Sequence, residues 1–282
     1  MSAPPKPAPP PPKTARPPQA APQQQQRERK APVISRGVMV GAQKIVIFGS
    51  GGAGKSSLAA AIDQLGSKPL FLDTDSGSGR LKVDRISPID HFDDLIGFLR
   101  DDSLCEHYGA IVIDAMTRAE ELAKGWVIEN IKHEKGHYVS KIDDYGFGKG
   151  VEHIYDTMLT LIAELDRHIR SGRHVICICH ECVTTVPNPA GEDWIRYEPR
   201  LQSPASGKNS VRHRIKEWAD HLVFIGFDTA VKEDGKAVGA GTRTIYTTEL
   251  PCWWAKSRSL SAPIPYEKDS AEFWQQLLNK DS

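Results

Sequence analysis

Long hydrophobic runs are absent from this chain of 282 residues. None reaches the roughly 18 consecutive apolar residues that a membrane-spanning helix needs, so we expect a protein that does not cross a membrane. The beginning of the chain is basic and rich in proline, and it lacks the apolar segment of a secretory signal peptide. Both absences favour a cytoplasmic location.

Net charge is also missing, because 36 Lys and Arg residues balance 36 Asp and Glu residues. Residues 1–40 nevertheless carry seven Lys or Arg and one Glu, which leaves 29 basic and 35 acidic residues in the remainder. The same segment holds eleven of the twenty prolines, the run QQQQ and few large apolar residues. Such a composition buries too little apolar surface to offset chain entropy. We therefore expect a disordered, basic, Pro-rich tail at residues 1–35 and one domain at residues 36–282.

Cysteine is scarce, at five residues, and three of the five lie in the run ICICHEC. The odd number favours reduced thiols in a cytosol over a disulfide framework. Cys177, Cys179, His180 and Cys182 are of metal-binding types, but in a strand Cys177 and Cys179 face one side and His180 the other. A buried strand is therefore favoured over a metal site.

Apolar strand-like runs alternate with helical ones after the tail. Strands are expected at 44–49, 69–74, 110–115, 174–180 and 221–227, and helices at 55–65, about 90–101, about 117–131 and 148–171. This alternation predicts an α/β fold with a mostly parallel sheet and helices on both faces. Beyond Phe227, Gly-rich turns between short alternating segments predict antiparallel hairpins at the C-terminal edge of the sheet, and AEFWQQLLN predicts a closing helix. Two irregular segments, 132–147 and 181–217, are long enough to indicate a functional role.

The stretch GSGGAGKSS matches the phosphate-binding pattern G-x-x-x-x-G-K-[ST], between a predicted strand and a predicted helix. Its glycines allow backbone N–H groups to point inward at a helix N-terminus, where anions are favoured. Lys55 should reach the β- and γ-phosphates of a nucleotide, and the Ser56 hydroxyl should join the shell of a Mg²⁺ ion. The predicted nucleotide-binding residues are Gly49, Ser50, Gly51, Gly52, Ala53, Gly54, Lys55, Ser56 and Ser57.

Two further predicted strands end in acidic residues. Asp114 closes the apolar run YGAIVID, where P-loop enzymes hold Mg²⁺ with a second acidic residue. Asp73 and Asp75 end FLDTD on one side of a strand, and one of them should orient or deprotonate the attacking water. We favour Asp75, which lies nearer the open carboxyl edge where ligands bind. His180, at the tip of the fourth strand, is either a contact for the terminal phosphate or a satisfied core residue.

The ordered set GSGGAGKSS, FLDTD, YGAIVIDAMT, DDYGFGKG, HVICICHE and WWAKSR resembles the RecA-like phage ATP-binding proteins, specifically the Sak-type phage recombination ATPases, over about residues 40–265. The resemblance implies a RecA-like P-loop NTPase core that hydrolyses ATP with Mg²⁺. It also implies that Asp75 is the catalytic carboxylate and His180 the γ-phosphate sensor. Glu is commoner than Asp at this catalytic position, so slow hydrolysis is expected. A phage origin would place the protein in the host cytoplasm.

WWAKSR carries the implied second half of the catalytic site. By resemblance, Lys256 and Arg258 reach the nucleotide of a neighbouring subunit, so that ATP is hydrolysed at a shared interface in a ring or filament. Alternation along the strand-like run before them places both cations on one face. Two cations at a sheet edge so far along the chain from the P-loop have little evident structural role, although a solvated pair is the alternative.

The resemblance further implies that the segments 131–147 and 181–217 face single-stranded DNA along the axis of the oligomer. Aromatic residues in these segments, among them Tyr138, Trp194 and Tyr197, are suited to stack on bases. Residues 206–216 hold no acid and carry four cations for DNA phosphates. The predicted DNA-binding cations are Lys208, Arg212, Arg214 and Lys216.

The function expected from the sequence is therefore an ATP-dependent, single-stranded-DNA-binding recombination or annealing protein. A single-strand-binding protein is a further candidate partner, through the basic tail. Two other classes stay open: a P-loop kinase or phosphotransferase for a small metabolite, and a nucleotide-switch adaptor that binds protein partners. The run VRHRIKEW also fits a solvated helix face without any DNA contact.

Overall fold

The computed structural model describes residues 41–231, 237–268 and 270–278, with side chains described outside 230–240. The predicted tail at residues 1–35 lies outside the described residues. Within these ranges, every helix is too short or too polar to span a bilayer.

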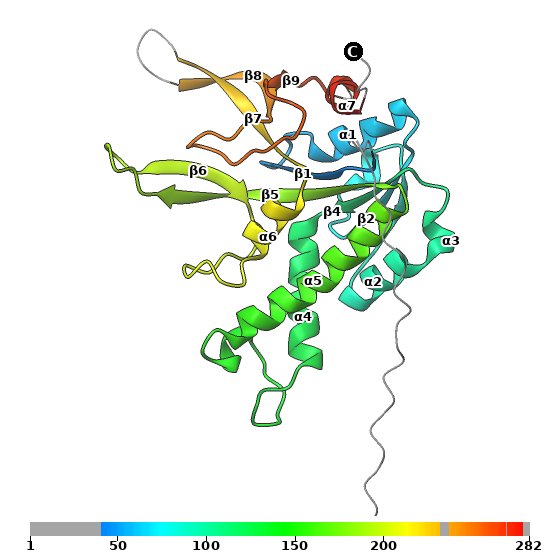
Figure 1. Ribbon diagram of the computed structural model, residues 1–282, viewed down its shortest axis with the longest axis vertical. Helices are drawn as coiled ribbons and strands as arrows, with labels where there is room; N and C mark the ends of the chain where they lie inside the picture. Colours follow the sequence, from blue (N-terminus) through cyan, green and yellow to red (C-terminus); the bar gives the residue numbers. More distant parts are fainter. Residues whose placement is uncertain (1–40, 232–236, 269, 279–282) are drawn as a thin grey trace, which may run out of the picture. The chain divides into compact units, whose positions relative to one another are not determined.

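One mixed sheet forms the centre of the fold (Figure 1). Its main path runs in the order β3 (Asp84–Ile86), β2 (Pro69–Asp73), β4 (Ala110–Asp114), β5 (His174–Val186), β1 (Lys44–Gly49), β7 (His221–Val231), β8 (Ala237–Tyr246) and β9 (Ile264–Pro265). Neighbours from β3 to β7 pair in parallel, and β8 and β9 continue the edge antiparallel. The predicted α/β fold, with a mostly parallel sheet and antiparallel strands at the C-terminal edge, is confirmed.

Both faces of the sheet are buried, because the strands are apolar at successive positions. In β1, Val46 and Phe48 belong to one core cluster while Ile45 and Ile47 belong to the other. The first cluster takes residues from α2 (Phe92–Arg100), α4 (Met116–Asn130), α5 (Lys149–Arg170) and α6 (Val211–Trp218). The second takes residues from α1 (Lys55–Ala60), the 3-10 turn η1 (Ala61–Leu65) and α7 (Glu272–Leu278). Helices therefore cover both faces, as predicted.

The segment 181–217 is more regular than expected. The strand predicted to end at residue 180 continues to Val186 and pairs antiparallel with β6 (Trp194–Pro199), and α6 follows. The expectation of one long irregular segment was wrong, because ECVTTV and WIRYEP pair in a partly exposed hairpin that no continuous apolar run marks. By contrast, the connection between α4 and α5 has only the short 3-10 turn η3 (Ile142–Tyr145).

Smaller departures concern element ends and short elements. The helix predicted over 55–65 is an α-helix only to Ala60 and then tightens into η1. The structure adds η2 (Ser78–Arg80), β3 and α3 (Asp102–Cys105), which the sequence pattern did not predict. All are three or four residues long, too short for a periodic signal.

Candidate nucleotide site

Strand ends bring the predicted site residues together at one edge of the sheet. Gly49 of β1 lies opposite His180 of β5, and Asp114 of β4 lies opposite Asp73 of β2. The P-loop follows β1 directly and leads into α1. The carboxyl ends of four neighbouring parallel strands therefore surround the loop, which is where parallel sheets bind ligands.

The P-loop needs glycine at two of its turns. Gly52 and Gly54 have φ of 77° and 97°, in the left-handed region that other residues adopt at a cost. A side chain at Gly54 would also lie 2.8 Å from both Arg243 Nη1 and the Tyr266 ring. Gly54 is the N-cap of α1, so the loop delivers its backbone N–H groups at a helix start.

Lys55 lies folded along the loop. Its Nζ donates hydrogen bonds of 2.8 Å to the carbonyls of Gly49 and Ser50. Burial lowers the pKa of Lys55, and the nearby carboxylate of Asp114 opposes that effect. The ammonium group is therefore held within the loop rather than on the surface.

Ser56 and Asp114 form the oxygen-donor pair expected for Mg²⁺. The Ser56 hydroxyl donates a 2.6 Å hydrogen bond to Asp114 Oδ2. Burial raises the pKa of Asp114 to about 6, against the effect of that hydrogen bond. A hydroxyl and a carboxylate in contact beside the P-loop fit a hard cation that prefers oxygen ligands.

Asp73 and Asp75 have different surroundings. Asp73 is 1% exposed and accepts hydrogen bonds from the Gly77 and Ser78 backbone N–H groups and from the Ser78 hydroxyl. Asp75 is partly exposed and lies 2.9 Å from His180 Nε2. Asp73 therefore holds the loop that follows β2, while Asp75 faces the edge with His180.

In the cysteine-rich strand β5, the side chains of Cys177 and Cys179 face a different side from that of His180, as the alternation predicts. Cys177 and Cys179 are fully buried in the core cluster, and burial raises the pKa of Cys177 to about 12. His180 is 35% exposed at its side chain and turns to Asp75. Across the part of the chain that the structure describes, no three His, Cys, Asp or Glu side chains gather as a metal-binding group.

Lys256 and Arg258 lie near the amino-terminal ends of β1 and β7, whereas the P-loop follows the carboxyl end of β1. The backbone of Lys256 exchanges two 2.7 Å hydrogen bonds with Leu222, which lies opposite Val46 near the start of β1. Lys256 Nζ donates to the carbonyls of Lys216 and Glu217 at the end of α6. Arg258 Nε lies 3.1 Å from Asp220 Oδ1 and its side chain is 68% exposed.

The expectation of little structural role was therefore wrong for Lys256, whose side chain has partners within the chain, whereas Arg258 has one exposed ion pair. Lys256 satisfies carbonyls that a helix end leaves without intrahelical partners. Arg258 keeps most of its side chain in solvent. Neither residue is near its own P-loop, so any contact with a nucleotide would be with that of another copy.

The four cations predicted to bind DNA differ in availability. Lys208 is exposed, and Arg214 is partly buried. Arg212 donates to Glu198 at 2.6 Å and to the Leu201 carbonyl, with 13% of its side chain exposed. Lys216 pairs with Glu249 at 2.7 Å and lies 4.2 Å from the centre of the Trp254 ring.

The prediction that the four cations bind DNA stays a prediction, and Arg212 and Lys216 are already paired within the protein. The reason is that α6 packs Val211, Ile215 and Trp218 into the core and brings its basic residues against neighbouring acids. Tyr197, predicted to stack on bases, instead stacks on Phe224 with ring centres 5.3 Å apart.

A cavity of about 510 Å³ opens beside the P-loop, and sequence reasoning missed it. Ser50 and Glu181 line the side next to the loop, and Asp228 lies on the wall formed by β7. The remaining wall is largely aromatic, from Tyr197, Phe224, Phe227, Tyr246 and Trp253. The lining residues come from six separate stretches of chain, so no local sequence signal marks the cavity.

The fold and this edge together define a P-loop nucleotide-binding domain. The chain belongs to the family described as an AAA domain, whose model matches residues 42–259. It is accordingly an ATPase-type domain, and nucleotide binding with Mg²⁺ is usual for that class.

Two solved structures are partly similar to the chain. A KaiC-like protein from the hyperthermophilic archaeon Pyrococcus horikoshii has 11% sequence identity and a TM-score of 0.44, over 80% of this chain and 86% of the other. The RadB recombinase has 15% identity and a TM-score of 0.37, over 73% and 80%. No curated protein sequence matches the chain at the level that marks a relative.

Proposed function

We propose that this protein is an ATP-hydrolysing recombination or annealing factor that binds single-stranded DNA. In this proposal ATP and Mg²⁺ bind at the P-loop and at the Ser56–Asp114 pair. Bound Mg²⁺ would neutralise charge on the phosphates. The basis for hydrolysis is the contact between Asp75 and His180 at the mouth of the loop.

The roles of this pair follow from their positions. Asp75 is the candidate group that orients or deprotonates water, since its carboxylate is partly exposed at the ligand edge. Its contact with His180 Nε2 fixes the imidazole, and the His180 backbone N–H is anchored to Thr117 Oγ1 at 3.1 Å. In this proposal His180 contacts the γ-phosphate of the bound nucleotide.

The distribution of exposed apolar side chains carries the DNA part of the proposal. Eight large apolar side chains are exposed in the described part of the chain, and five of them lie in the two segments 132–147 and 181–217. These five are Tyr138, Phe147, Val183, Trp194 and Ile195. Exposed aromatic rings stack on the bases of a single strand whatever its sequence.

Phe147 is the most prominent of the five. It is fully exposed and has φ of 47°, between Gly146 and Gly148, which also have positive φ. A bulky residue held in the left-handed region is unusual and often marks a functional site. Exposed Lys149 lies two residues after Phe147, and Lys132 Nζ lies 5.1 Å from the centre of the Tyr138 ring.

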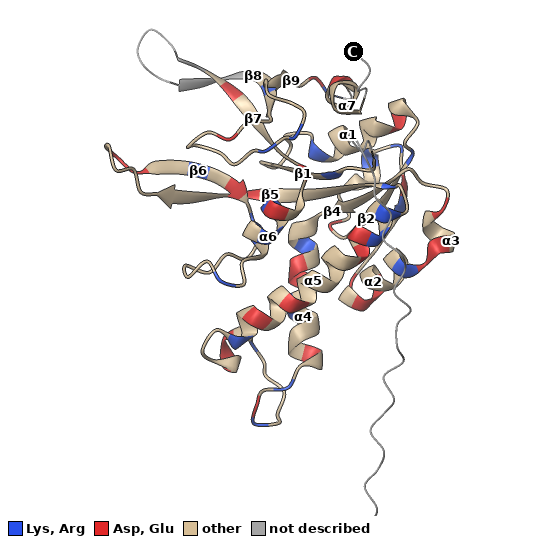
Figure 2. Cartoon of the chain, in the orientation of Figure 1, with Lys and Arg blue, Asp and Glu red and all other residues tan. Residues whose placement is uncertain are grey.

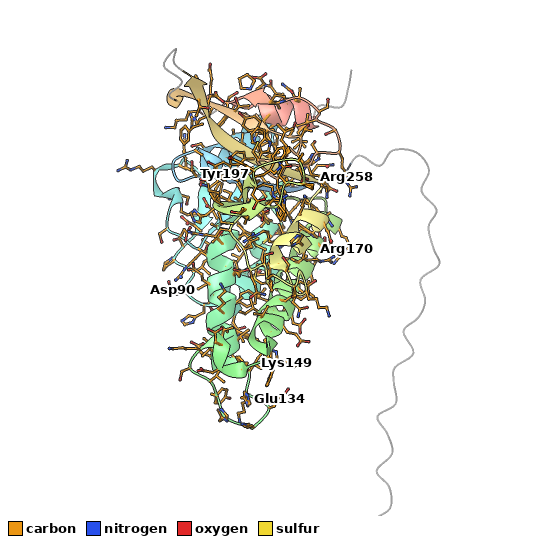
Figure 3. All side chains as sticks on the ribbon, turned by 90° about the vertical axis from the view of Figure 1, so that its left-hand side faces the viewer. Asp90, Glu134, Lys149, Arg170, Tyr197 and Arg258 are labelled. Atoms are coloured by element: carbon orange, nitrogen blue, oxygen red, sulfur yellow. The ribbon has the colours of Figure 1, made fainter. Side chains whose placement is uncertain are left out.

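These segments lie along one side of the domain. In Figure 1 the β5–β6 hairpin, the stretch before α6 and the α4–α5 connection follow one another down the left-hand side. Figure 3, turned to view that side, shows Tyr197 above and Lys149 and Glu134 at the far end. Figure 2 shows acidic and basic residues interspersed around the α4–α5 connection. We therefore expect stacking to contribute more than net charge to DNA binding there.

The test is the ATPase rate with and without single-stranded DNA, together with the DNA dissociation constant. One stacked base contributes about 1–3 kcal/mol, so Phe147→Ala should weaken binding by about 5- to 150-fold. Its ATPase rate without DNA should stay that of the wild type. Leu104→Ala, at an exposed apolar residue outside both segments, is the matched control. Unchanged DNA affinity in Phe147→Ala, or no binding by the wild type, would contradict the proposal.

The cavity beside the P-loop favours a second candidate, a phosphotransferase for a small acceptor. Its aromatic wall suits a planar ring, and the carboxyl groups of Glu181 and Asp228 suit a group that donates hydrogen bonds. Transfer of labelled phosphate from ATP to a nucleoside or an amino alcohol would support this candidate. Stimulation by single-stranded DNA, with inorganic phosphate as the product, would support the first.

A further inference from the structure

The C-terminal part of the domain contacts the P-loop and α1 at three backbone carbonyls. Arg243 Nη1, from β8, donates to Ala53 O at 2.9 Å, and the Tyr266 hydroxyl donates to Gly54 O at 2.8 Å. Trp274 Nε1, from α7, donates to Leu58 O at 2.6 Å. Figure 1 shows α7 beside α1. Tyr266 and Trp274 lie beyond residue 259, where the family match ends.

Arg243 and Tyr266 also hold each other in place. The Arg243 guanidinium lies 4.9 Å from the centre of the Tyr266 ring, and Tyr266 N donates to Arg243 O at 2.8 Å. Tyr266 is 4% exposed and belongs to the same core cluster as Ala53. Tyr266 therefore meets the loop from a packed position, and the partly exposed Arg243 is held against its ring.

Peptide geometry links these contacts to phosphate binding. In a trans peptide unit the C=O and the following N–H lie in one plane and point in opposite directions. Holding the Ala53 carbonyl therefore orients the Gly54 N–H, and holding the Gly54 carbonyl orients the Lys55 N–H. Backbone N–H groups at this turn of a P-loop are those that cradle nucleotide phosphates.

We propose that Arg243 and Tyr266 are positioning residues of the nucleotide site, which aim the Gly54 and Lys55 N–H groups at the polyphosphate. This inference rests on the proposed binding of nucleotide at the P-loop. Arg243 also places a positive charge against the outer side of the loop, which favours anionic ligands. The residues C-terminal to the family match are then part of the site and not only its cover.

Trp274 provides a matched comparison within the same segment. Its contact is with Leu58, in the body of α1, where the carbonyl does not orient a phosphate-facing N–H. Trp274→Phe and Tyr266→Phe each remove one hydrogen-bond donor to a carbonyl of this region. Loss of the Trp274 contact should lower stability without changing nucleotide affinity.

The experiment measures the dissociation constant for MgADP in the wild type, Tyr266→Phe, Arg243→Gln and Trp274→Phe, each shown to be folded by its urea unfolding curve. Tyr266→Phe should bind about 3- to 10-fold more weakly, the effect of one hydrogen bond. Arg243→Gln should lose more affinity for MgADP at low salt than at high salt. Its difference in affinity from the wild type should shrink as salt screens the charge. In both variants KM for ATP should rise more than kcat falls.

Hydrogen exchange in the nucleotide-free proteins gives a second, independent readout. The Gly54 and Lys55 amides should exchange faster in Tyr266→Phe than in Trp274→Phe. Equal MgADP affinity in Tyr266→Phe and the wild type, or equal weakening in Trp274→Phe, would overturn the inference. A wild type that does not bind MgADP would instead overturn the nucleotide assignment, and the exchange rates would still report on the loop.

Discussion

The substitution Asp114→Asn should stabilise the nucleotide-free protein near neutral pH. Burial raises the pKa of Asp114 from 3.8 to about 6, so the folded chain holds this proton more tightly than the unfolded chain does. This difference between the pKa values of the folded and unfolded chain corresponds to about 3 kcal/mol. The stability that comes from the protonated acid is complete below pH 3.8 and is lost as the pH rises through about 6.

Asparagine stays neutral at every pH, so the advantage of the variant should depend on pH. Its free energy of unfolding should exceed that of the wild type by up to about 3 kcal/mol at pH 7, and by about half as much at pH 5. Urea unfolding curves between pH 4 and pH 8 measure this difference. MgADP should then stabilise the wild type more than the variant, because the variant lacks the carboxylate that a cation needs.

Asp102→Asn is a control for which the opposite effect on the free energy of unfolding is expected. The pKa of Asp102 is lowered by its contact with Arg167, so this variant should be the less stable one at neutral pH and approach the wild type in acid. If Asp114→Asn and the wild type unfold alike at pH 7, or differ by the same amount at all pH values, the burial argument for Asp114 is wrong.

Three further predictions concern the other site residues. Asp75→Asn should keep MgATP binding and lower turnover by about 100- to 10,000-fold, whereas Asp73→Asn should mainly lower stability. Steady-state kinetics and unfolding curves measure both effects, and the reverse result would show that the assignment is wrong. Arg258→Ala should bind ATP but hydrolyse it poorly, and mixing it with Lys55→Ala should restore activity; no rescue between exchanging subunits would refute a shared site. Arg212→Ala should cost about 2–4 kcal/mol of stability by leaving buried Glu198 with one partner fewer, and equal stability would return Arg212 to the candidate DNA contacts.

Much of the site could be predicted because its signals are local. The P-loop motif, the acid at the end of β4 and the histidine at the end of β5 each follow an apolar strand, and parallel strands bring such ends to one edge. The choice of Asp75 over Asp73 remains a prediction, and the hydrogen bonds around Asp73 support it. The β5–β6 hairpin was missed because most of its residues are partly or fully exposed, so no continuous apolar run marks it.

The chain itself determines the α/β architecture, the order of its elements and the phosphate-binding loop, since hydrophobic periodicity and glycine spacing act over a few residues at a time. Only the tertiary structure decides which charged groups remain free. Arg212 and Lys256 look like exposed cations in the sequence, yet Glu198 and the end of α6 pair with them from other parts of the chain. The same holds for Tyr266, which meets Gly54 from 212 residues away. Packing between distant segments, which no local pattern encodes, sets the partners of these side chains.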